Sequence, residues 1–262
     1  MKWTECLGLI ALGFLCSLTS PAQAPHTFQN PNLPVEERIT DLLASMTLDE
    51  KIAVLGTTTA VPRLGVPEAG RSEGLHGLVQ RSLGGLGNQK ITATTQFAQV
   101  VGMAQTWDPD LIRRAGEVQA TEARWIANHK ENPVAPPLVI WGPNADLARD
   151  PRWGRIDESY GEDAFFTGTM ASAFVKGVQG EDPKYWRAAA LLKHFLANSN
   201  EHGRYGSSSD FDERLFREYY SLPFRMAFEA GAESYMASYN AWNQVPMTVH
   251  PVLKTIVASE WV

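Results

Sequence analysis

The sequence has 262 residues, with 23 lysines and arginines against 29 aspartates and glutamates, and a net charge of −6 at neutral pH. This acidic balance disfavours nucleic acid as the main partner, because phosphate backbones are bound through clustered basic side chains. The two cysteines are Cys6 and Cys16, so disulfides and thiolate metal sites are excluded from everything that follows them.

The first residues have the pattern of an export signal. Lys2 supplies a positive charge, 7–18 is an apolar run, and Ala22-Gln23-Ala24 is a small-x-small cleavage site. The run is too short to span a bilayer, which takes about 20 apolar residues. We therefore expect a signal peptide over 1–24 and a secreted or periplasmic protein without a membrane anchor.

The next part of the chain predicts several helices. Residues 35–45 have helical spacing, and Thr47-Leu48-Asp49-Glu50 is a capping box that begins a short helix to Leu55. Residues 56–90 are rich in Gly, Thr, Ser and Pro and indicate a loop around short extended pieces. We expect a helix over 92–106. Asp108-Pro109, an N-cap followed by proline at the first helical position, begins a further helix that runs to about His129.

Short apolar strands then alternate with helices. The predicted strands are 138–141, 188–192 and 234–238, and the predicted helices are 165–178, 215–230 and 251–261. This alternation indicates a parallel sheet with crossover helices.

A doubly wound sheet and a barrel both fit this alternation. Long polar loops follow the strands, which is where (β/α) barrels carry their functional groups. A doubly wound nucleotide binder would instead have a tight Gly-rich turn there, and the candidate at 84–87 follows no clear strand. We therefore expect an α/β fold of the (β/α) barrel type over 25–262.

The strongest motif is R-D-P-R-W-G-R at 149–155, followed by E-S-Y-G-E-D at 158–163. Arginine offers forked donors to adjacent hydroxyls, and an indole stacks on apolar sugar faces, so the motif suits a polyhydroxylated ligand. From the residue types alone, an ion-paired loop that braces itself is the alternative. The whole pattern resembles the signature of glycoside hydrolase family 3, which contains β-glucosidases and β-xylosidases.

Other segments resemble the same family in the same order. They are E-G-L-H-G at 73–77, K-H-F-L-A-N at 193–198, the segment from Asp212 to Phe224, and M-A-S-Y-N at 236–240. The resemblance covers about residues 34–261, and it implies a (β/α)8 TIM-barrel domain that is incomplete at its C-terminal end. It implies hydrolysis of terminal, non-reducing β-D-glycosyl residues by a retaining mechanism with two carboxylates. The N-acetylhexosaminidase branch carries K-H-F-P-G-H-G, so the K-H-F-L-A-N sequence argues against that branch.

The resemblance also assigns candidate site residues. Arg155, Lys193 and His194 are expected to bind hydroxyls of the sugar in the first subsite, since charged donors to oxygen are stronger than neutral ones. The family holds the K-H peptide bond cis, and we expect this between Lys193 and His194. Tyr239 matches a tyrosine whose phenol points at the nucleophile. Met236 matches a methionine of the first subsite, with an ordinary core methionine as an equal alternative.

Glu73 occupies a position where the family's glucosidases usually carry Asp. Its side chain reaches about one methylene further and would crowd a C6 hydroxymethyl group, so Glu73 favours a pentoside such as a β-xyloside. Arg152 is expected to brace its loop and His76 to be structural. Trp242 either stacks on substrate or covers the barrel mouth.

No cofactor and no metal are expected, because the spacing of His202, Asp210 and Asp212 fits no compact ligand pattern. The expected partner is an oligosaccharide or an aryl or alkyl β-glycoside, and the sequence indicates no oligomeric state. The nucleophile (Asp) and the acid/base (Glu) are expected beyond Val262, together with the family's following α/β sandwich domain.

Two alternatives belong to other classes of protein. One is a non-catalytic carbohydrate-binding barrel, which a missing Asp on the next strand would indicate. The other is an unrelated, phosphate-handling barrel enzyme. That enzyme would need a Gly-rich anion site at a helix N-terminus late in the barrel, and none is visible.

Overall fold

The computed structural model describes residues 26–56, 59–79, 93–129 and 136–261, so the expected signal peptide lies outside the described residues. The chain forms two compact units, one up to Ala53 and one from Val54 onward. The first unit contains a 3₁₀ turn at Thr27–Gln29, α1 (Val35–Ser45) and most of α2 (Leu48–Val54). Within the part that the structure describes, no helix is both long and apolar enough to cross a membrane.

The capping box predicted at 47–50 is confirmed. The Thr47 backbone N–H donates to Glu50 Oε2 at 2.8 Å, and the Glu50 backbone N–H donates to Thr47 Oγ1 at 3.2 Å. Two backbone donors that the first turn of α2 would otherwise leave open are thereby paired. The predicted bounds of α1 are also confirmed.

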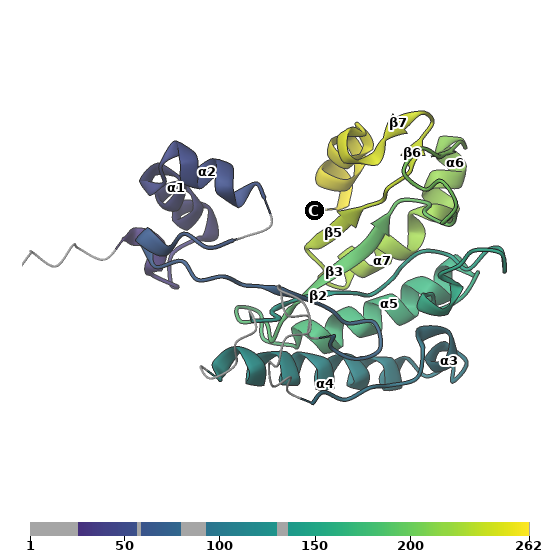
Figure 1. Cartoon of the computed structure of the whole chain (residues 1–262), viewed down its shortest axis with the longest axis horizontal. Coiled ribbons are helices and arrows are strands. Elements are labelled where there is room, and N and C mark those ends of the chain that lie inside the picture. Colours follow the sequence, from purple (N-terminus) through teal and green to yellow (C-terminus); the bar gives the residue numbers. More distant parts are fainter. Residues whose placement is uncertain (1–25, 57–58, 80–92, 130–135, 262) are drawn as a thin grey trace, which may run out of the picture. The chain divides into compact units, whose positions relative to one another are not determined.

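The second unit is built on a parallel sheet of four strands in the order β1-β2-β3-β5 (Figure 1). These are β1 (Arg71–Glu73), β2 (Val139–Trp141), β3 (Ala189–Phe195) and β5 (Ser234–Ala237). Three of the strands match the predicted ones, although β3 continues through the K-H-F motif. The sequence missed β1 as a strand, because three residues in a Gly- and Pro-rich segment are too few to show a period. The α/β class is confirmed.

The crossover helices are α3 (Val100–Ala104), α4 (Pro109–Asn128), α5 (Ala164–Gln179), α6 (Glu213–Leu215) and α7 (Leu222–Glu229). Asp108 caps α4 as predicted, accepting from the Leu111 N–H at 3.1 Å. Two segments are π-helical, at Phe216–Tyr220 and Leu253–Trp261. Shorter 3₁₀ turns lie at Pro62–Leu64, Ile156–Glu158 and Met247–Val249.

Two predicted helices need correction. Residues 93–99 are not helical, because the hydroxyl of Thr94 donates to the Leu78 carbonyl at 2.9 Å and the Thr95 N–H donates to Glu122 at 2.9 Å. Threonine side chains that bond across to other segments compete with a helix. The helix predicted over 215–230 is broken before α7, whose first turn holds Pro223. Proline has no N–H to continue the preceding helix, but it fits the first turn of a new one.

Helices α4, α5 and α7 lie side by side on one face of the sheet, with α4 packed against α5 and α5 against α7 (Figure 1). Glycine permits the closest of these approaches. A Cβ atom on Gly177 of α5 would lie 2.0 Å from the Arg113 carbonyl oxygen of α4, and one on Gly116 would lie 2.8 Å from the Phe174 carbonyl oxygen. Because neither glycine has a side chain, the backbones of α4 and α5 can come into contact at these two positions.

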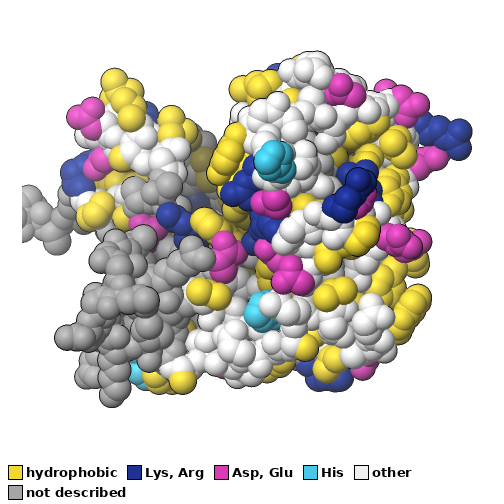
Figure 2. All heavy atoms as spheres, turned by 45° about the vertical axis from the view of Figure 1, so that its right-hand side comes forward, with side chains coloured by type: hydrophobic (Ala, Val, Ile, Leu, Met, Phe, Trp, Pro, Cys, Tyr) yellow, Lys and Arg dark blue, Asp and Glu magenta, His cyan; other side chains and the backbone are white. Residues whose placement is uncertain are grey.

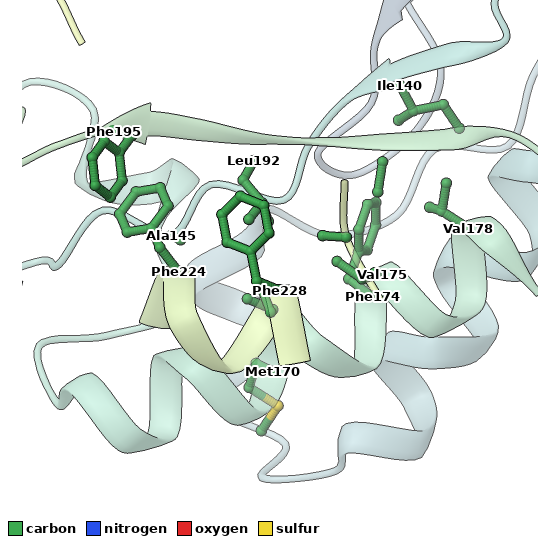
Figure 3. Packing of buried hydrophobic residues seen from close by; sticks show 14 of the residues in the cluster. Ile140, Ala145, Met170, Phe174, Val175, Val178, Leu192, Phe195, Phe224 and Phe228 are labelled. Atoms are coloured by element: carbon green, nitrogen blue, oxygen red, sulfur yellow. The ribbon is translucent and has the colours of Figure 1, made fainter. Parts of the chain in front are cut away.

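Between the helices and the sheet lies an apolar layer (Figure 3). Phe174 and Val178 of α5 meet Ile140 of β2 and Leu192 of β3, and all four are fully buried. At the end of β3, the ring of Phe195 packs edge-on against Phe224, with centroids 5.1 Å apart. This layer fixes the sheet on its helices, so the carboxyl ends of the strands become a defined edge.

A smaller sheet connects the loops that follow β3 and β5. Its strands are β4 (Ser208–Ser209), β6 (Ala241–Trp242) and β7 (Val245–Pro246), with β4 parallel and β7 antiparallel to β6. Asn243 and Gln244 form the turn between β6 and β7, both with positive φ, as the tightest hairpins require. The pairing holds together the two loops that carry Arg204 and Tyr239.

Candidate functional site

The sheet brings functional side chains together at one edge. Glu73 is the last residue of β1, Trp141 the last of β2, and Lys193 and His194 lie near the end of β3. Glu73 pairs in register with Trp141, and all these strands run parallel. Their carboxyl ends therefore meet at one edge, which is where parallel α/β folds bind ligands. The peptide bond between Lys193 and His194 is cis, as expected.

Lys193 is buried and paired with acids. Its side chain is 3% exposed, with Nζ 2.7 Å from Glu73 Oε2 and 3.9 Å from Glu158 Oε2. An ammonium taken out of water is tolerated only where such partners compensate the lost hydration. Glu73 and Lys193 therefore form an ion pair that links β1 to β3.

Arg155 and Glu158 form a bidentate pair in the R-W-G-R loop. Arg155 Nε donates to Glu158 Oε1 at 2.7 Å, and its Nη2 donates to Oε2 at 2.6 Å. Burial raises the pKa of Glu158, but the hydrogen bonds and charge of Arg155, with the charge of Lys193, outweigh burial and hold that pKa below its usual value. Glu158 is therefore an ionised anchor for Arg155. The sequence did not single it out.

The protonation of His194 follows from its two neighbours. Nη1 of Arg155 lies 3.2 Å from His194 Nε2, and a guanidinium nitrogen can only donate, so Nε2 is the acceptor. The proton then sits on Nδ1, which donates to Asp146 Oδ2 at 2.7 Å. The same oxygen accepts the His194 backbone N–H at 3.2 Å. Asp146 thus sets the tautomer and the orientation of the ring.

Sequence reasoning missed Asp146. It follows β2 in the segment Asn144-Ala145-Asp146, and its side chain is fully buried. The available signal was an acid in the loop that follows a correctly predicted strand, in a fold that places functional groups on such loops.

A cavity of about 480 Å³ lies at this edge, a size typical of small-molecule sites. All six predicted binding residues line it: Glu73, Arg155, Lys193, His194, Met236 and Tyr239. Trp141, Glu158 and Arg204, which the sequence did not select, line it as well. We call this cavity the strand-end cleft. On the face seen in Figure 2, acidic and basic side chains are interspersed with histidine. The role of these residues in binding stays a prediction.

Other candidate residues lie outside the strand-end cleft. Trp242 is 6% exposed and stacks on Phe216 with ring centroids 4.8 Å apart, so it belongs to the core. Arg152 braces its loop as expected, with Nη2 2.5 Å from Asp150 Oδ2. Within the described ranges, no three or more of His, Cys, Asp and Glu are grouped to hold a metal ion.

A larger hollow of about 710 Å³ is lined by Arg149, Asp150, Arg152, Trp153, Gly154, Ser199, Asn200, Glu201 and His202. It holds no residue from a strand of the parallel sheet, and Arg152 and Glu201 are already engaged with Asp150 and Arg204. The strand-end cleft, with its buried ion pairs, is therefore the stronger candidate.

Comparison with known proteins places this geometry in a family. Residues 46–261 match the model of the glycosyl hydrolase family 3 N-terminal domain. The chain is 34% identical to probable β-D-xylosidase 7 of Arabidopsis thaliana over 94% of its length and 34% of that protein. It is 35% identical to a xylan 1,4-β-xylosidase of Xylanibacter ruminicola over 96% of its length and 30% of that protein.

Solved structures agree with the sequence matches. A family 3 exo-β-xylosidase in complex with a xylobiose aziridine probe superposes with a TM-score of 0.77 at 30% identity, over 88% of this chain and 30% of the other. β-Glucosidase 3B of Thermotoga neapolitana in complex with α-D-glucose gives a TM-score of 0.73 at 27% identity, over 86% of this chain and 32% of the other. The chain thus spans about a third of the length of the relatives it matches.

Proposed function

The chain belongs to glycosyl hydrolase family 3, and we propose that the protein hydrolyses β-glycosides and releases a terminal, non-reducing β-D-glycosyl residue. The observation that carries this proposal is the strand-end cleft. It combines the buried Lys193, the paired Arg155 and His194, and the ring of Tyr239 around one cavity. Such a set offers directional charged donors to sugar hydroxyls and an aromatic face to the apolar side of the ring.

The favoured substrate is a β-xyloside. Glu73 comes from the end of β1 into the cleft and is held there by Lys193 at 2.7 Å, so its longer side chain cannot easily withdraw. A C6 hydroxymethyl group, which xylose lacks, would compete with this carboxylate for space. The β-xylosidase names of the two sequence relatives support the same choice.

The proposed mechanism is retaining. It needs a nucleophile and an acid/base with carboxyl groups about 5–5.5 Å apart. Glu73 and Glu158 of the cleft are held in ion pairs with Lys193 and Arg155, so they suit binding rather than attack. We propose that the nucleophile and the acid/base lie after Val262, as the family resemblance implies.

The fold and the location are proposed together with the function. All four strands of the described sheet are parallel, and α4, α5 and α7 lie on one of its faces, as in a (β/α)8 barrel whose helices form an outer ring. The signal pattern at 1–24 supports export. The charged donors that line the strand-end cleft support a β-glycoside as the partner.

The non-catalytic carbohydrate-binding alternative gains no support from the comparisons, because the relatives cited above all carry hydrolase names. Activity decides between the two functions. A protein that binds β-xylosides and never cleaves them would be a binding module.

The test is hydrolysis of aryl β-xyloside and aryl β-glucoside by the protein expressed from its complete gene. We expect xyloside to be cleaved at least as well as glucoside. The Glu73→Asp variant should shift the ratio of kcat/KM toward glucoside by relieving the crowding at C6. Glu229→Asp, an exposed acid paired with Arg225, is the matched control and should leave the ratio unchanged. A clear glucoside preference in the unmodified protein would refute the steric argument.

A further inference from the structure

Tyr239 lines the strand-end cleft, but no anchor holds its hydroxyl. The structure gives the hydroxyl no hydrogen bond within the described residues, and the side chain is 43% exposed. Its ring lies 6.4 Å from that of His194, centroid to centroid. What fixes the direction of the phenol must therefore act on the ring itself.

Arg204 contacts that ring. Its guanidinium carbon lies 4.5 Å from the centroid of Tyr239 and 5.2 Å from that of Tyr205. The two tyrosine rings meet edge to face at 4.8 Å. A guanidinium within about 6 Å of an aromatic face is attracted by the ring's negative surface. Arg204 thus lies against two rings that also touch each other.

Arg204 is itself held in place. Its Nη1 donates to Glu201 Oε2 at 2.6 Å, and Glu201 Oε1 accepts the indole N–H of Trp153 at 3.1 Å. Trp153 is buried in the R-W-G-R loop, with 4% of its surface exposed. The chain of contacts runs from the loop after β2, through the loop after β3, to the loop after β5. Glu201 is charged and Trp153 is buried, so together they restrict the conformations that the Arg204 side chain can adopt.

We propose that Arg204 is a positioning residue, which sets the orientation of Tyr239 in the strand-end cleft and is held for that purpose by Glu201 and Trp153. The inference rests on the proposed function, because Tyr239 is the group that would meet the sugar. Arg204 acts through the face of the tyrosine ring. The planar guanidinium matters as well as the charge, since a lysine ammonium cannot lie flat on the ring.

The test measures binding of an aryl β-thioxyloside, a non-hydrolysable analogue, to the protein expressed from its complete gene, by calorimetry. Arg204→Met should weaken binding about fivefold, the size expected for one partly exposed cation–π contact. Arg204→Lys should restore only part of the loss. Arg214→Met is the matched control, an arginine paired with Glu218 on the exposed surface, and should bind as the unmodified chain does.

A double-mutant cycle with Tyr239→Leu separates positioning from direct contact. If Arg204 acts through Tyr239, Arg204→Met has no further effect once the ring is gone. An equal loss in both backgrounds would show that Arg204 contacts the sugar itself and would overturn the proposal. Should Arg204→Met fail to fold in a urea titration, Glu201→Gln takes its place. It keeps the bond from Trp153, weakens the anchor of Arg204, and should give a smaller loss in the same cycle.

A second readout does not depend on sugar. The side-chain protons of Arg204 should show an upfield ring-current shift in NMR spectra, and Tyr239→Leu should reduce it to the part that comes from Tyr205. A shift that Tyr239→Leu leaves unchanged overturns the positioning role whatever the binding data show. Failure of the unmodified chain to bind either xyloside or glucoside, with the ring-current shift present, counts against the proposed function and leaves the contact established.

Discussion

The apolar layer and the strand-end cleft share strand β3 but are stabilised in different ways. Beneath the sheet, Phe174, Leu192 and Phe195 are held by contact area, which has no direction and is spread over many neighbours. In the cleft, the nearest partner of Lys193 and of His194 is one carboxylate oxygen at 2.7 Å. Losing one contact in the first region is a graded cost. Losing one partner in the second leaves a buried charge or an open donor.

The first prediction, with the largest effect, breaks the helix side of this comparison. Gly177→Ala places a methyl group 2.0 Å from the Arg113 carbonyl oxygen, a backbone atom that can move only with α4. The clash outweighs the gain of about 1 kcal/mol in helix propensity. We expect a net loss of about 3 kcal/mol in the free energy of unfolding, measured in urea.

Gly102→Ala is the control for that variant. A Cβ atom there meets only Ala98 Cβ at 3.7 Å, an ordinary van der Waals contact, so stability should stay the same or rise slightly. Equal losses from both glycines would mean that close helix contact is not the cause.

The second prediction breaks the polar side. Lys193→Met keeps the length of the side chain but leaves Glu73 without its cation and Glu158 with less positive charge nearby. Binding of an aryl β-thioxyloside should weaken about 30-fold, in line with the loss of one charged hydrogen bond. Lys254→Met, an exposed lysine, should bind normally. Undiminished binding by Lys193→Met would remove Lys193 from the site.

The third prediction concerns the tautomer of His194. At neutral pH, nitrogen-15 NMR of the ring should show the proton on Nδ1, because Nε2 accepts from Arg155 and Nδ1 donates to Asp146. Asp146→Asn removes the charge behind the ring and should weaken thioxyloside binding about tenfold. A proton found on Nε2 would contradict this arrangement.

The fourth prediction has the smallest effect and concerns how the ion pair of Glu158 with Arg155 depends on pH. The folded-state pKa of Glu158 lies below 4.5, so its ion pair stabilises the fold above that pH and is lost as the pH falls through the folded value. The difference in unfolding free energy between the unmodified chain and Glu158→Gln should therefore be largest near neutral pH and shrink below about pH 4.5. A difference that grows as the pH falls would contradict this prediction.

The sequence determined the elements whose signals are local. Asp108 before Pro109, the capping box at 47–50 and the apolar runs that became β2, β3 and β5 all depend on neighbours within a few residues. The motif residues of the cleft were also found in this way, since a resemblance in sequence carries their identity and order. Local rules failed at 93–99, where the hydroxyl groups of Thr94 and Thr95 bond to distant segments.

Only the tertiary structure decided which partners these residues have. Asp146 behind His194, Glu73 beside Lys193 and Arg204 on the ring of Tyr239 join residues that come from different strands and loops. Each is a short-range interaction of a few ångströms, and no period or propensity encodes which loop will come within that distance. The parallel sheet and its helices set those distances. The sequence therefore named six of the residues that line the cleft, and the packing beneath it decided how each one is charged, oriented and held.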